Sequence, residues 1–309
     1  MELKNIKGKR IAYSCLDWGM GHVTRSVGIM RKLIEQENDI VFFGEEFQYL
    51  YLKEYVPKLL FVELSAYRLE FRGKGNFASD LWKNRSRFKE AMKHEYMVLQ
   101  EYCTKNQIDI VVSDHRYGFY HPEMTSVFVT HQLRLPVNWL QFPAQWQHTK
   151  WLKKFNIIWI PDDKKQSFSG KLSKPIKAAK LDYIGVQSRF TGKVMNRMEY
   201  DFLLVLSGPD VYALQLHEQI KSNTEFEGKK MAVLHAESLK IPDKNPNWYY
   251  VSSKNPMEQD DLFYSSECII SRSGYSTIMD LAVLEKKAIL IPTPGQKEQE
   301  YLFSIYKQT

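Results

Sequence analysis

The chain has 309 residues, 44% apolar and 26% charged, with a net charge of +7, which indicates a globular protein long enough for two domains and excludes a disordered or collagen-like chain. Its three cysteines, Cys15, Cys103 and Cys268, are far apart and form no CxxC pair, which excludes a disulfide framework and a zinc site and favours a reducing, cytosolic compartment. The apolar run Ile11–Leu16 is too short for a signal-peptide core, and no run approaches the roughly 20 apolar residues of a spanning helix, so we expect a protein that does not cross a membrane.

The first half of the chain alternates predicted strands with predicted helices. Arg10–Leu16 is a short apolar run before a glycine-containing turn and predicts a strand, whereas the apolar residues of His22–Gln36 recur at helical spacing. Phe77–Asn106 contains neither Gly nor Pro and is rich in helix formers, which predicts one long helix or two in series. The other elements expected here are strands at Asp39–Gly44, Leu60–Leu64, Ile108–Ser113 and Met124–Thr130 and a helix at Glu45–Tyr55.

The middle of the chain is less regular. Asn138–Phe155 contains three tryptophans with Pro143 between them. Ile157–Ile160 predicts a strand, and the polar, lysine-rich segment Lys164–Lys180 predicts a surface loop. An apolar run resumes at Tyr183–Val186.

A second alternation of strands and helices follows and indicates a second α/β lobe. Its expected strands are Phe202–Leu206, Lys230–His235, Trp248–Val251, Cys268–Ser271 and Ala288–Ile291, and its expected helices are Val211–Lys221, Met257–Ser265 and Ser273–Leu284. Such alternation predicts parallel, doubly wound, Rossmann-like sheets. We therefore expect two lobes, residues 1–184 and 185–309, joined near Tyr183–Arg189, with a ligand in the cleft between them, beyond the carboxyl ends of the strands.

The strongest chemical motif is the strand-to-helix segment Cys268–Asp280. Ser273 is a good N-cap residue and Gly274 leaves the helix entrance clear, so the free N–H groups and the positive end of the helix dipole suit a pyrophosphate. Asp280 lies about 10 Å further along this helix, a suitable position for binding ribose hydroxyls. The alternative is an ordinary capped helix with Asp280 facing solvent.

A second motif is the turn that follows the last predicted strand, Ile291–Glu300. Two prolines and a glycine make a rigid turn, after which Gln296, Glu298 and Gln299 open a helix. Amides and carboxylates at a fixed turn can both donate to and accept from sugar hydroxyls. The alternative is a polar helix start. Ser207-Gly208-Pro209 is a weaker signal, a short turn before a helix that offers a second phosphate contact.

In the first lobe, Asp17-Trp-Gly-Met-Gly-His22 joins the first strand to the first helix. Gly19 and Gly21 allow close approach of the backbone to a ligand, although Thr24 breaks the full dinucleotide fingerprint. A helix N-terminus lowers the pKa of a histidine, which would keep His22 neutral and able to act as a base. The alternative is a packing or capping role for His22.

The segment Ser113–Gly118 follows another predicted strand and so reaches the same edge of the sheet. Asp114 and His115 are candidates for activating a hydroxyl, and Arg116 for holding an anion. The alternative is a loop whose polar groups satisfy one another.

Together these motifs resemble the GT-B glycosyltransferases, and within them the branch with the family 28 type of C-terminal domain that includes the lipid-linked N-acetylglucosamine transferase of peptidoglycan synthesis. Arg272-Ser273-Gly274 with Thr277 and Asp280 matches the donor helix of that branch, with Asp280 where the family has Glu.

Other positions extend the resemblance over both lobes. Gln299 matches a glutamine that contacts the donor sugar, while Glu300 stands where a second glutamine is usual. The remaining matches are Arg189, in a Gly-x-x-x-Arg expected to contact phosphate, Ser207-Gly208 on a glycine-rich turn, and Gly19, Gly21 and His22 on a Gly-Gly-His loop. Asp114-His115-Arg116 has no counterpart in the family and is assigned to acceptor recognition, with Asp114 also a candidate base.

The resemblance implies inverting, metal-independent transfer of a hexose or N-acetylhexosamine from a UDP-sugar to a sugar or lipid-linked acceptor. His22 or Asp114 would accept the acceptor proton, and Arg189, Arg272 and the helix start would stabilise the leaving UDP. No cofactor besides the donor substrate is expected. The alternatives are a UDP-sugar 2-epimerase of the same fold and a non-catalytic nucleotide-sugar-binding protein. The family's final helix, which crosses back to the first lobe, is expected to be missing or very short, since only nine residues follow Glu300.

Part of the net positive charge lies between Gln147 and Lys180, a segment that contains nine lysines and only two acidic residues. This segment is either a solvated lobe surface or a surface that attracts an anionic partner, such as acidic lipid on the inner membrane face or a phosphorylated acceptor. No nucleic-acid-binding motif occurs, so nucleic acid is not an expected partner.

Overall fold

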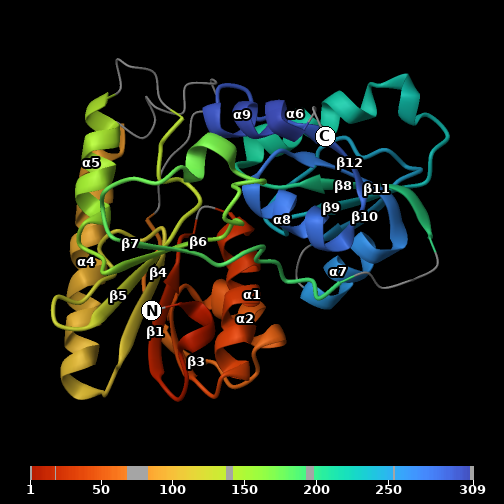
Figure 1. Ribbon diagram of the computed structural model, residues 1–309. Helices are drawn as coiled ribbons and strands as arrows, with labels where there is room; N and C mark the ends of the chain where they lie inside the picture. Colours follow the sequence, from red (N-terminus) through yellow and green to blue (C-terminus); the bar gives the residue numbers. More distant parts are fainter. Residues whose placement is uncertain are drawn as a thin grey trace. The chain divides into compact units, whose positions relative to one another are not determined.

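The computed structural model describes residues 2–17, 19–67, 83–136, 142–192, 198–252 and 255–306. Within them the chain forms two compact units, each built on one parallel sheet (Figure 1). The first unit holds nearly all of the chain up to Arg189, and the second holds residues 19–21 and the chain from Phe190 onward. The prediction of an α/β chain with two doubly wound lobes is confirmed.

The first unit alternates strands and helices along most of its length. Its strands are β1 (Arg10–Cys15), β2 (Asp39–Gly44), β3 (Leu60–Glu63), β4 (Ile110–Asp114), β5 (Thr125–Val129), β6 (Ile157–Ile160) and β7 (Lys180–Tyr183). Its described helices are α1 (Gly21–Glu35), α2 (Glu46–Tyr55), α4 (Arg85–Lys105) and α5 (Phe142–Leu152), with short 3₁₀ helices η1 (Leu3–Asn5) and η3 (Gly170–Ser173).

The sheet of the first unit has the strand order β3-β2-β1-β4-β5-β6-β7, and all its strand pairs are parallel. In the central register, Tyr13 of β1 lies opposite Phe42 of β2 and Val112 of β4. The chain fills the sheet outward from β1 in both directions, so the strand order reverses between β1 and β4. Ligands of open α/β sheets bind at such a reversal, beyond the carboxyl ends of the strands.

The central strands are apolar because both of their faces are covered. Tyr13, Phe42 and Val112 are fully buried, as expected for parallel strands between two layers of helices. Helix α1 packs closely on the chain that leaves this unit: a Cβ atom at Gly28 would lie 2.6 Å from the carbonyl oxygen of Ser188. Only glycine permits this approach of helix to backbone.

One expectation for the middle of the chain is wrong. The segment expected to be irregular contains helix α5, whose first turn accommodates Pro143 because the first N–H groups of a helix have no partner inside the helix. Trp139 lies outside the described residues. The lysine-rich segment is a surface loop as predicted, and it is held at its start by buried Asp162, whose carboxylate accepts from the N–H groups of Asp163 and Ser169 at 2.7 and 2.9 Å. The last strand, β7, begins three residues before the predicted apolar run.

The second unit repeats the architecture on a smaller scale. Its strands are β8 (Tyr200–Leu206), β9 (Met231–His235), β10 (Tyr249–Ser252), β11 (Ser266–Arg272) and β12 (Lys287–Ile291). Its helices are α6 (Asp210–Lys221), α7 (Pro256–Ser265), α8 (Tyr275–Leu284) and α9 (Lys297–Tyr306), with the 3₁₀ helix η4 (Thr224–Phe226).

The strand order of the second unit is β10-β9-β8-β11-β12, again all parallel. The order reverses between β8 and β11, so the turns that leave these two strands, Ser207-Gly208 and Ser273-Gly274, flank the reversal point. Apolar side chains of β8, β9, α6 and β11 form the core beneath it, among them Leu204, Leu216 and Ile270.

Candidate active site

The reversal point of the first sheet brings together a histidine and an aspartate. His22 is the second residue of α1, which follows β1, and Asp114 is the last residue of β4. The His22 Nδ1 nitrogen lies 2.9 Å from the Asp114 Oδ1 oxygen. The Asp114 carboxylate is fully buried, whereas the His22 side chain keeps 18% of its surface exposed. The two residues that the sequence offered as alternative bases therefore form one hydrogen-bonded pair.

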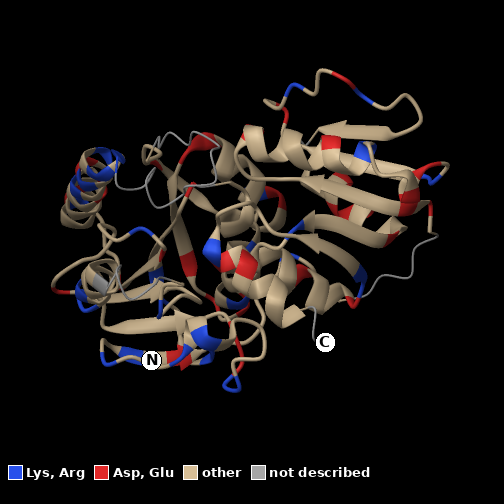
Figure 2. Ribbon diagram, turned by 90° about the horizontal axis from the view of Figure 1, so that it is seen from above, with Lys and Arg blue, Asp and Glu red and all other residues tan. Residues whose placement is uncertain are grey.

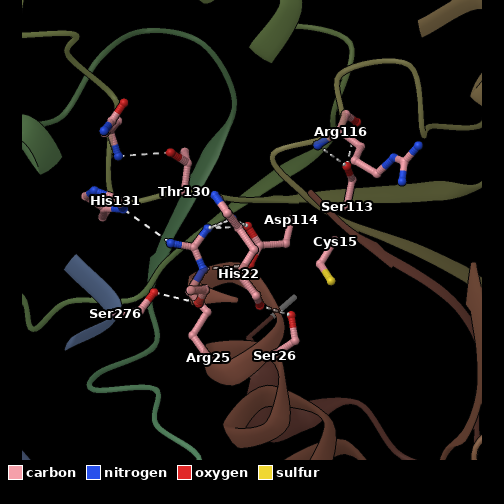
Figure 3. A network of polar contacts seen from close by, with 12 residues as sticks. Cys15, His22, Arg25, Ser26, Ser113, Asp114, Arg116, Thr130, His131 and Ser276 are labelled. Carbon is pink, nitrogen blue, oxygen red and sulfur yellow. Dashed lines mark hydrogen bonds and ion pairs between the residues drawn. The ribbon is translucent and has the colours of Figure 1, made fainter. Parts of the chain in front are cut away.

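An arginine one helical turn after His22 completes this group (Figure 3). The Arg25 Nε nitrogen donates to Asp114 Oδ2 at 2.6 Å, and its NH2 nitrogen donates to Oδ1 of the same carboxylate. NH2 also lies 2.7 Å from His22 Nδ1, and NH1 lies 3.5 Å from Nδ1 of His131, which follows β5. Sequence reasoning missed both Arg25 and His131. Two signals were available: the i,i+3 spacing of His22 and Arg25, and the place of His131 after a strand, like that of Asp114.

The charges of this buried group set its pKa values. Burial raises the pKa of Asp114, but the adjacent Arg25 and His22 outweigh burial and hold that pKa well below its ordinary value. Burial and the Arg25 charge lower the pKa of His22, against the opposing effect of Asp114. The pKa of His115 is lowered further by burial and by its cationic neighbours. At neutral pH the carboxylate is therefore ionised and both imidazoles are neutral.

The turn after β4 presents His115 in a left-handed backbone conformation, with φ of 61°. Ser113 holds this turn, because its hydroxyl donates to the carbonyl of Arg116 at 2.6 Å and accepts from the Arg116 N–H at 3.1 Å. The rings of His115 and His22 are 5.1 Å apart. The Nε2 nitrogen of His115 is buried without a hydrogen-bond partner among the described residues.

Arg116 does not lie where an anionic acceptor could reach it. Its side chain is 1% exposed, and its Nε nitrogen donates to Oε2 of Glu95 on α4 at 2.8 Å. A second nitrogen donates to the carbonyl of Ser65 at 2.8 Å, and the guanidinium lies over the Tyr67 ring at 5.1 Å. The expected acceptor-binding role of Arg116 is therefore corrected: it forms an internal ion pair that supports the turn.

In the second unit the start of α8 lies where the donor helix was expected, but it is capped differently. The N-cap residue is Gly274, with extended backbone and no side-chain hydrogen bond to the helix. The Ser273 hydroxyl donates instead to the carbonyl of Gln299 at 2.9 Å, so its predicted role as the N-cap is wrong. The first N–H groups of a helix have no partner within the helix, and here the N-cap residue is a glycine, which has no side chain to bind them.

Arg272 ends β11 directly before this helix start. Its NH1 nitrogen donates to the carbonyl of Pro292 at 3.1 Å, and NH2 donates to the carbonyl of Tyr212 at 2.7 Å. The side chain is buried, and its Nε nitrogen has no hydrogen-bond partner among the described residues. Burial lowers the pKa of Arg272, but the ordinary pKa of arginine is so high that the group stays charged at neutral pH. Arg272 is thus a charged residue that directly precedes the start of α8 in the chain, with one buried nitrogen unpaired among the described residues.

The turn after β12 is tied to the same helix start through Gln299. The Gln299 Oε1 oxygen accepts from the N–H of Thr293 at 2.8 Å, so the amide oxygen serves the turn itself. The N–H of Gln296 donates to the Thr293 carbonyl at 3.1 Å, and the side chains of Gln296 and Glu298 are half-buried. Glu300 pairs with Lys297 at 2.7 Å.

The remaining predicted donor residues lie in different surroundings. Asp280 is 4% exposed on α8, rather than facing solvent, and Thr277 is half-buried one turn before it. Ser207 and Gly208 are exposed, with Gly208 at φ of 86°. Arg189 is 5% exposed in the first unit, and its carbonyl accepts from a guanidinium nitrogen of Arg31.

Gly19, in the loop before α1, and Gly21, the first residue of α1, differ in their conformational freedom. Gly19 is exposed with φ of 76°, a backbone conformation that favours glycine. Gly21 is counted with the second unit, and its carbonyl accepts from the hydroxyl of Ser276 on α8 at 2.6 Å. A Cβ atom at Gly21 would lie 3.2 Å from that hydroxyl oxygen, so a side chain here would press on α8.

Two classes of site are not found in the described part of the chain. No group of three or more His, Cys, Asp or Glu side chains there is arranged to hold a metal ion. No described helix combines the length and the apolar character that crossing a membrane requires.

Comparison with known proteins agrees with this geometry. Residues 204–301 match the model of the glycosyltransferase family 28 C-terminal domain, whereas no curated protein matches the chain in sequence. Among solved structures, Phytolacca americana UGT2 complexed with UDP-2fluoro-glucose and pterostilbene has 11% identity and a TM-score of 0.61, over 98% of this chain and 84% of that one.

Two further structures are similar at the same level of identity. The spinosyn rhamnosyltransferase SpnG complexed with thymidine diphosphate has 11% identity and a TM-score of 0.59, over 96% of this chain and 84% of that one. MurG of Acinetobacter baumannii has 11% identity and a TM-score of 0.54, over 97% of this chain and 84% of that one. Residues 204–301 therefore form a domain of the glycosyltransferase family 28 C-terminal type in a chain of GT-B fold, and the protein is a glycosyltransferase.

Proposed function

We propose that the protein transfers a hexose or N-acetylhexosamine from a UDP-sugar to an acceptor hydroxyl, with inversion and without a metal ion. The observation that carries this proposal is the start of α8, whose N-cap is Gly274 and which directly follows Arg272, a buried arginine whose Nε has no hydrogen-bond partner among the described residues. Helix N–H groups and a buried guanidinium are the donors that a diphosphate needs. They would stabilise the two charges that develop on the leaving UDP.

The base in this proposal is His22, with Asp114 as its partner. Asp114 is fully buried, has both oxygens bound and has a pKa far below neutrality, so it is unsuited to accepting a proton. His22 is neutral and partly exposed, and Asp114 can accept the proton of its Nδ1. Nε2 would then take the proton of the acceptor hydroxyl as that oxygen attacks the anomeric carbon.

The nucleotide is tested directly with a thermal-shift panel of UDP, GDP, TDP and their sugars. We expect UDP and its sugars to raise the melting temperature most, since a ligand that binds only the folded state stabilises it by mass action. One of the similar structures is complexed with UDP-2fluoro-glucose and another with thymidine diphosphate, so TDP is the informative competitor. If no nucleotide or nucleotide sugar raised the melting temperature, the proposal would be contradicted.

Asp280 offers a sharper test of the ribose contact. We expect Asp280→Ala to weaken UDP binding about 10- to 100-fold, because a hydrogen bond to a charged group contributes about 1.5–3 kcal/mol. Calorimetric titration with UDP measures this. Asp261→Ala, which removes an exposed acid from α7 in the same unit, is the matched control and should bind UDP like the wild type. Equal UDP affinity of the wild type, Asp280→Ala and Asp261→Ala would contradict the assignment of Asp280 to the ribose.

We further propose that the lysine-rich segment 147–180 contacts an anionic lipid surface or lipid-linked acceptor. Lys and Arg occur on many elements of both units with Asp and Glu among them, so net charge alone selects no surface (Figure 2). All nine lysines of this segment are exposed, and beside them Trp146 is 59% exposed with Lys150 over its ring at 5.4 Å. An amphipathic tryptophan among lysines is typical of residues at a membrane interface.

Charge reversal tests this surface. We expect Lys150→Glu/Lys153→Glu/Lys154→Glu to reduce sedimentation with vesicles containing phosphatidylglycerol by at least about tenfold, since each lysine near an acidic surface contributes about 1 kcal/mol. The control, Lys229→Glu/Lys240→Glu/Lys287→Glu, changes the net charge equally on exposed residues of the second unit. Equal losses in the two variants, or binding to vesicles of phosphatidylcholine alone, would contradict the proposal.

A further inference from the structure

The Nδ1 nitrogen of His22 has two neighbours with opposite demands. Asp114 Oδ1, at 2.9 Å, can only accept a hydrogen bond, and Arg25 NH2, at 2.7 Å, can only donate one. A ring nitrogen carries either a proton or a lone pair, so Nδ1 satisfies one of these neighbours at a time. With the proton on Nδ1, Nε2 has the lone pair that a base requires. With the lone pair on Nδ1, the proton of neutral His22 is on Nε2 and the ring cannot act as a base there.

We propose that Arg25 is a positioning residue that sets the protonation state and the tautomer of His22. Arg25 binds both oxygens of Asp114 and so keeps that carboxylate in place against Nδ1. Its charge opposes protonation of the ring, and its NH2 group competes with Asp114 for Nδ1. The catalytic meaning of this role rests on the proposed function, but the role itself is a property of the ligand-free protein.

The surroundings of His22 single out Arg25. The titratable or charged groups that face His22 are Arg25 on α1, Asp114 and His115 at the end of β4, and His131 at the end of β5. Both neighbouring histidines are ordinarily weak bases, so Arg25 is the permanent cation of this set. On β1, the hydroxyl of Tyr13 lies 3.1 Å from that of Ser26. Arg25 itself is 2% exposed, so water screens its charge little.

Nitrogen NMR of histidine-labelled protein measures both quantities without any substrate. The chemical shifts of Nδ1 and Nε2 report which nitrogen carries the proton, and a pH titration gives the pKa; the His22 signals are identified by their loss in His22→Gln. In Arg25→Gln we expect the His22 titration midpoint to move to higher pH and the Nδ1–H tautomer to increase, because the opposing charge and the competing donor are both gone. A higher midpoint together with more of the Nδ1–H tautomer would support the proposal.

Arg25→Lys separates charge from geometry and covers the case in which Arg25→Gln does not fold. Lysine keeps the positive charge but has a single donor nitrogen in place of the planar fork. We expect its His22 midpoint to stay closer to that of the wild type while the Nδ1–H tautomer increases. Unchanged tautomer populations in both variants that fold, or an unchanged midpoint in Arg25→Gln, would overturn the proposal.

A matched control distinguishes this role from a general loss of structure. Arg116→Gln breaks an equally buried arginine–carboxylate pair in the same unit, with Glu95 in place of Asp114, and Arg116 has no contact with His22. We expect this variant to lose stability but to keep the His22 midpoint and tautomer. The same NMR changes in Arg116→Gln would mean that loosening of the fold is their cause. The proposed function fails separately, through absent nucleotide binding, with these NMR results unaffected.

Discussion

Replacing His22 with Gln lowers the turnover of sugar transfer by about 10²- to 10⁴-fold, the usual contribution of a positioned general base. The affinity for UDP stays that of the wild type, because the proposed diphosphate contacts come from α8 and Arg272 in the second unit. The first quantity is measured as UDP release in the presence of an acceptor that supports wild-type turnover, and the second by calorimetry. Glutamine keeps a polar group beside Asp114, so the loss reports chemistry rather than a cavity.

The control for this substitution is His94→Gln, which makes the same change at an exposed position of α4 and is expected to leave turnover unchanged. Turnover of His22→Gln equal to the wild type would rule out His22 as the base, and a parallel loss of UDP affinity would assign it to donor binding instead.

The pH profile gives a second test of the base. A base works in its neutral form, and the pKa of His22 is lowered by burial and by Arg25. The rate should therefore rise with pH along an acid limb whose midpoint lies below the ordinary pKa of histidine. The measurement is kcat/KM across the acidic range; a midpoint at or above the ordinary value would contradict the assignment of the limb to His22.

The fold could be predicted from the sequence because its signals are local. Apolar runs such as Asp39–Gly44 and helical spacing such as that of His22–Gln36 lie within single elements, and both elements are found within one residue of the predicted bounds. The carboxyl ends of parallel strands also share one edge of the sheet. For this reason the sequence alone predicted that His22 and Asp114 lie at the same site. No element was predicted over helix α5, whose first turn contains Pro143, a position that tolerates proline.

The partners of the site residues could not be predicted because they lie far away in the chain. Arg25 and Asp114 are separated by 89 positions, and no local pattern pairs them. Ser273 shows the same limit: its residue type suits an N-cap, but a carbonyl 26 positions away takes its hydroxyl. The residue type indicates which local roles a side chain can take. Which role it has in the folded protein depends on tertiary contacts.

Arg116 is another residue whose partner could not be predicted from the sequence. Its replacement is expected to have the largest effect on stability. Its sequence neighbours Asp114 and His115 suggested an anion site, whereas the structure pairs it with Glu95 of α4. Glu95 also accepts from the Tyr67 hydroxyl at 2.7 Å and from the N–H of Gly118 at 2.5 Å, so one carboxylate binds both Arg116 and Gly118 in the segment that follows His115.

We expect Arg116→Met to reduce the free energy of unfolding by about 3–5 kcal/mol, because it leaves the Glu95 carboxylate buried without its cation. Urea unfolding followed by tryptophan fluorescence measures this, and Trp159 of β6, which is fully buried, reports on the same unit. The double variant Glu95→Gln/Arg116→Met should recover most of the loss, since a glutamine amide oxygen can still accept from Tyr67 and Gly118 while both buried charges are removed. A double variant as unstable as the single one would mean that packing, rather than the unpaired charge, is the cause.

The pH dependence of the single variant follows from the sign of the Glu95 shift. Burial raises the pKa of Glu95, and Arg116 opposes that effect, so removing Arg116 raises this pKa further. The folded protein then binds the proton of Glu95 more tightly than the unfolded chain does, and stability falls as the pH rises through the raised pKa. The deficit of Arg116→Met relative to the wild type should therefore be smaller at mildly acidic pH than at neutral pH. A deficit that is independent of pH would show that Glu95 remains ionised in the variant, with its charge compensated by groups other than Arg116.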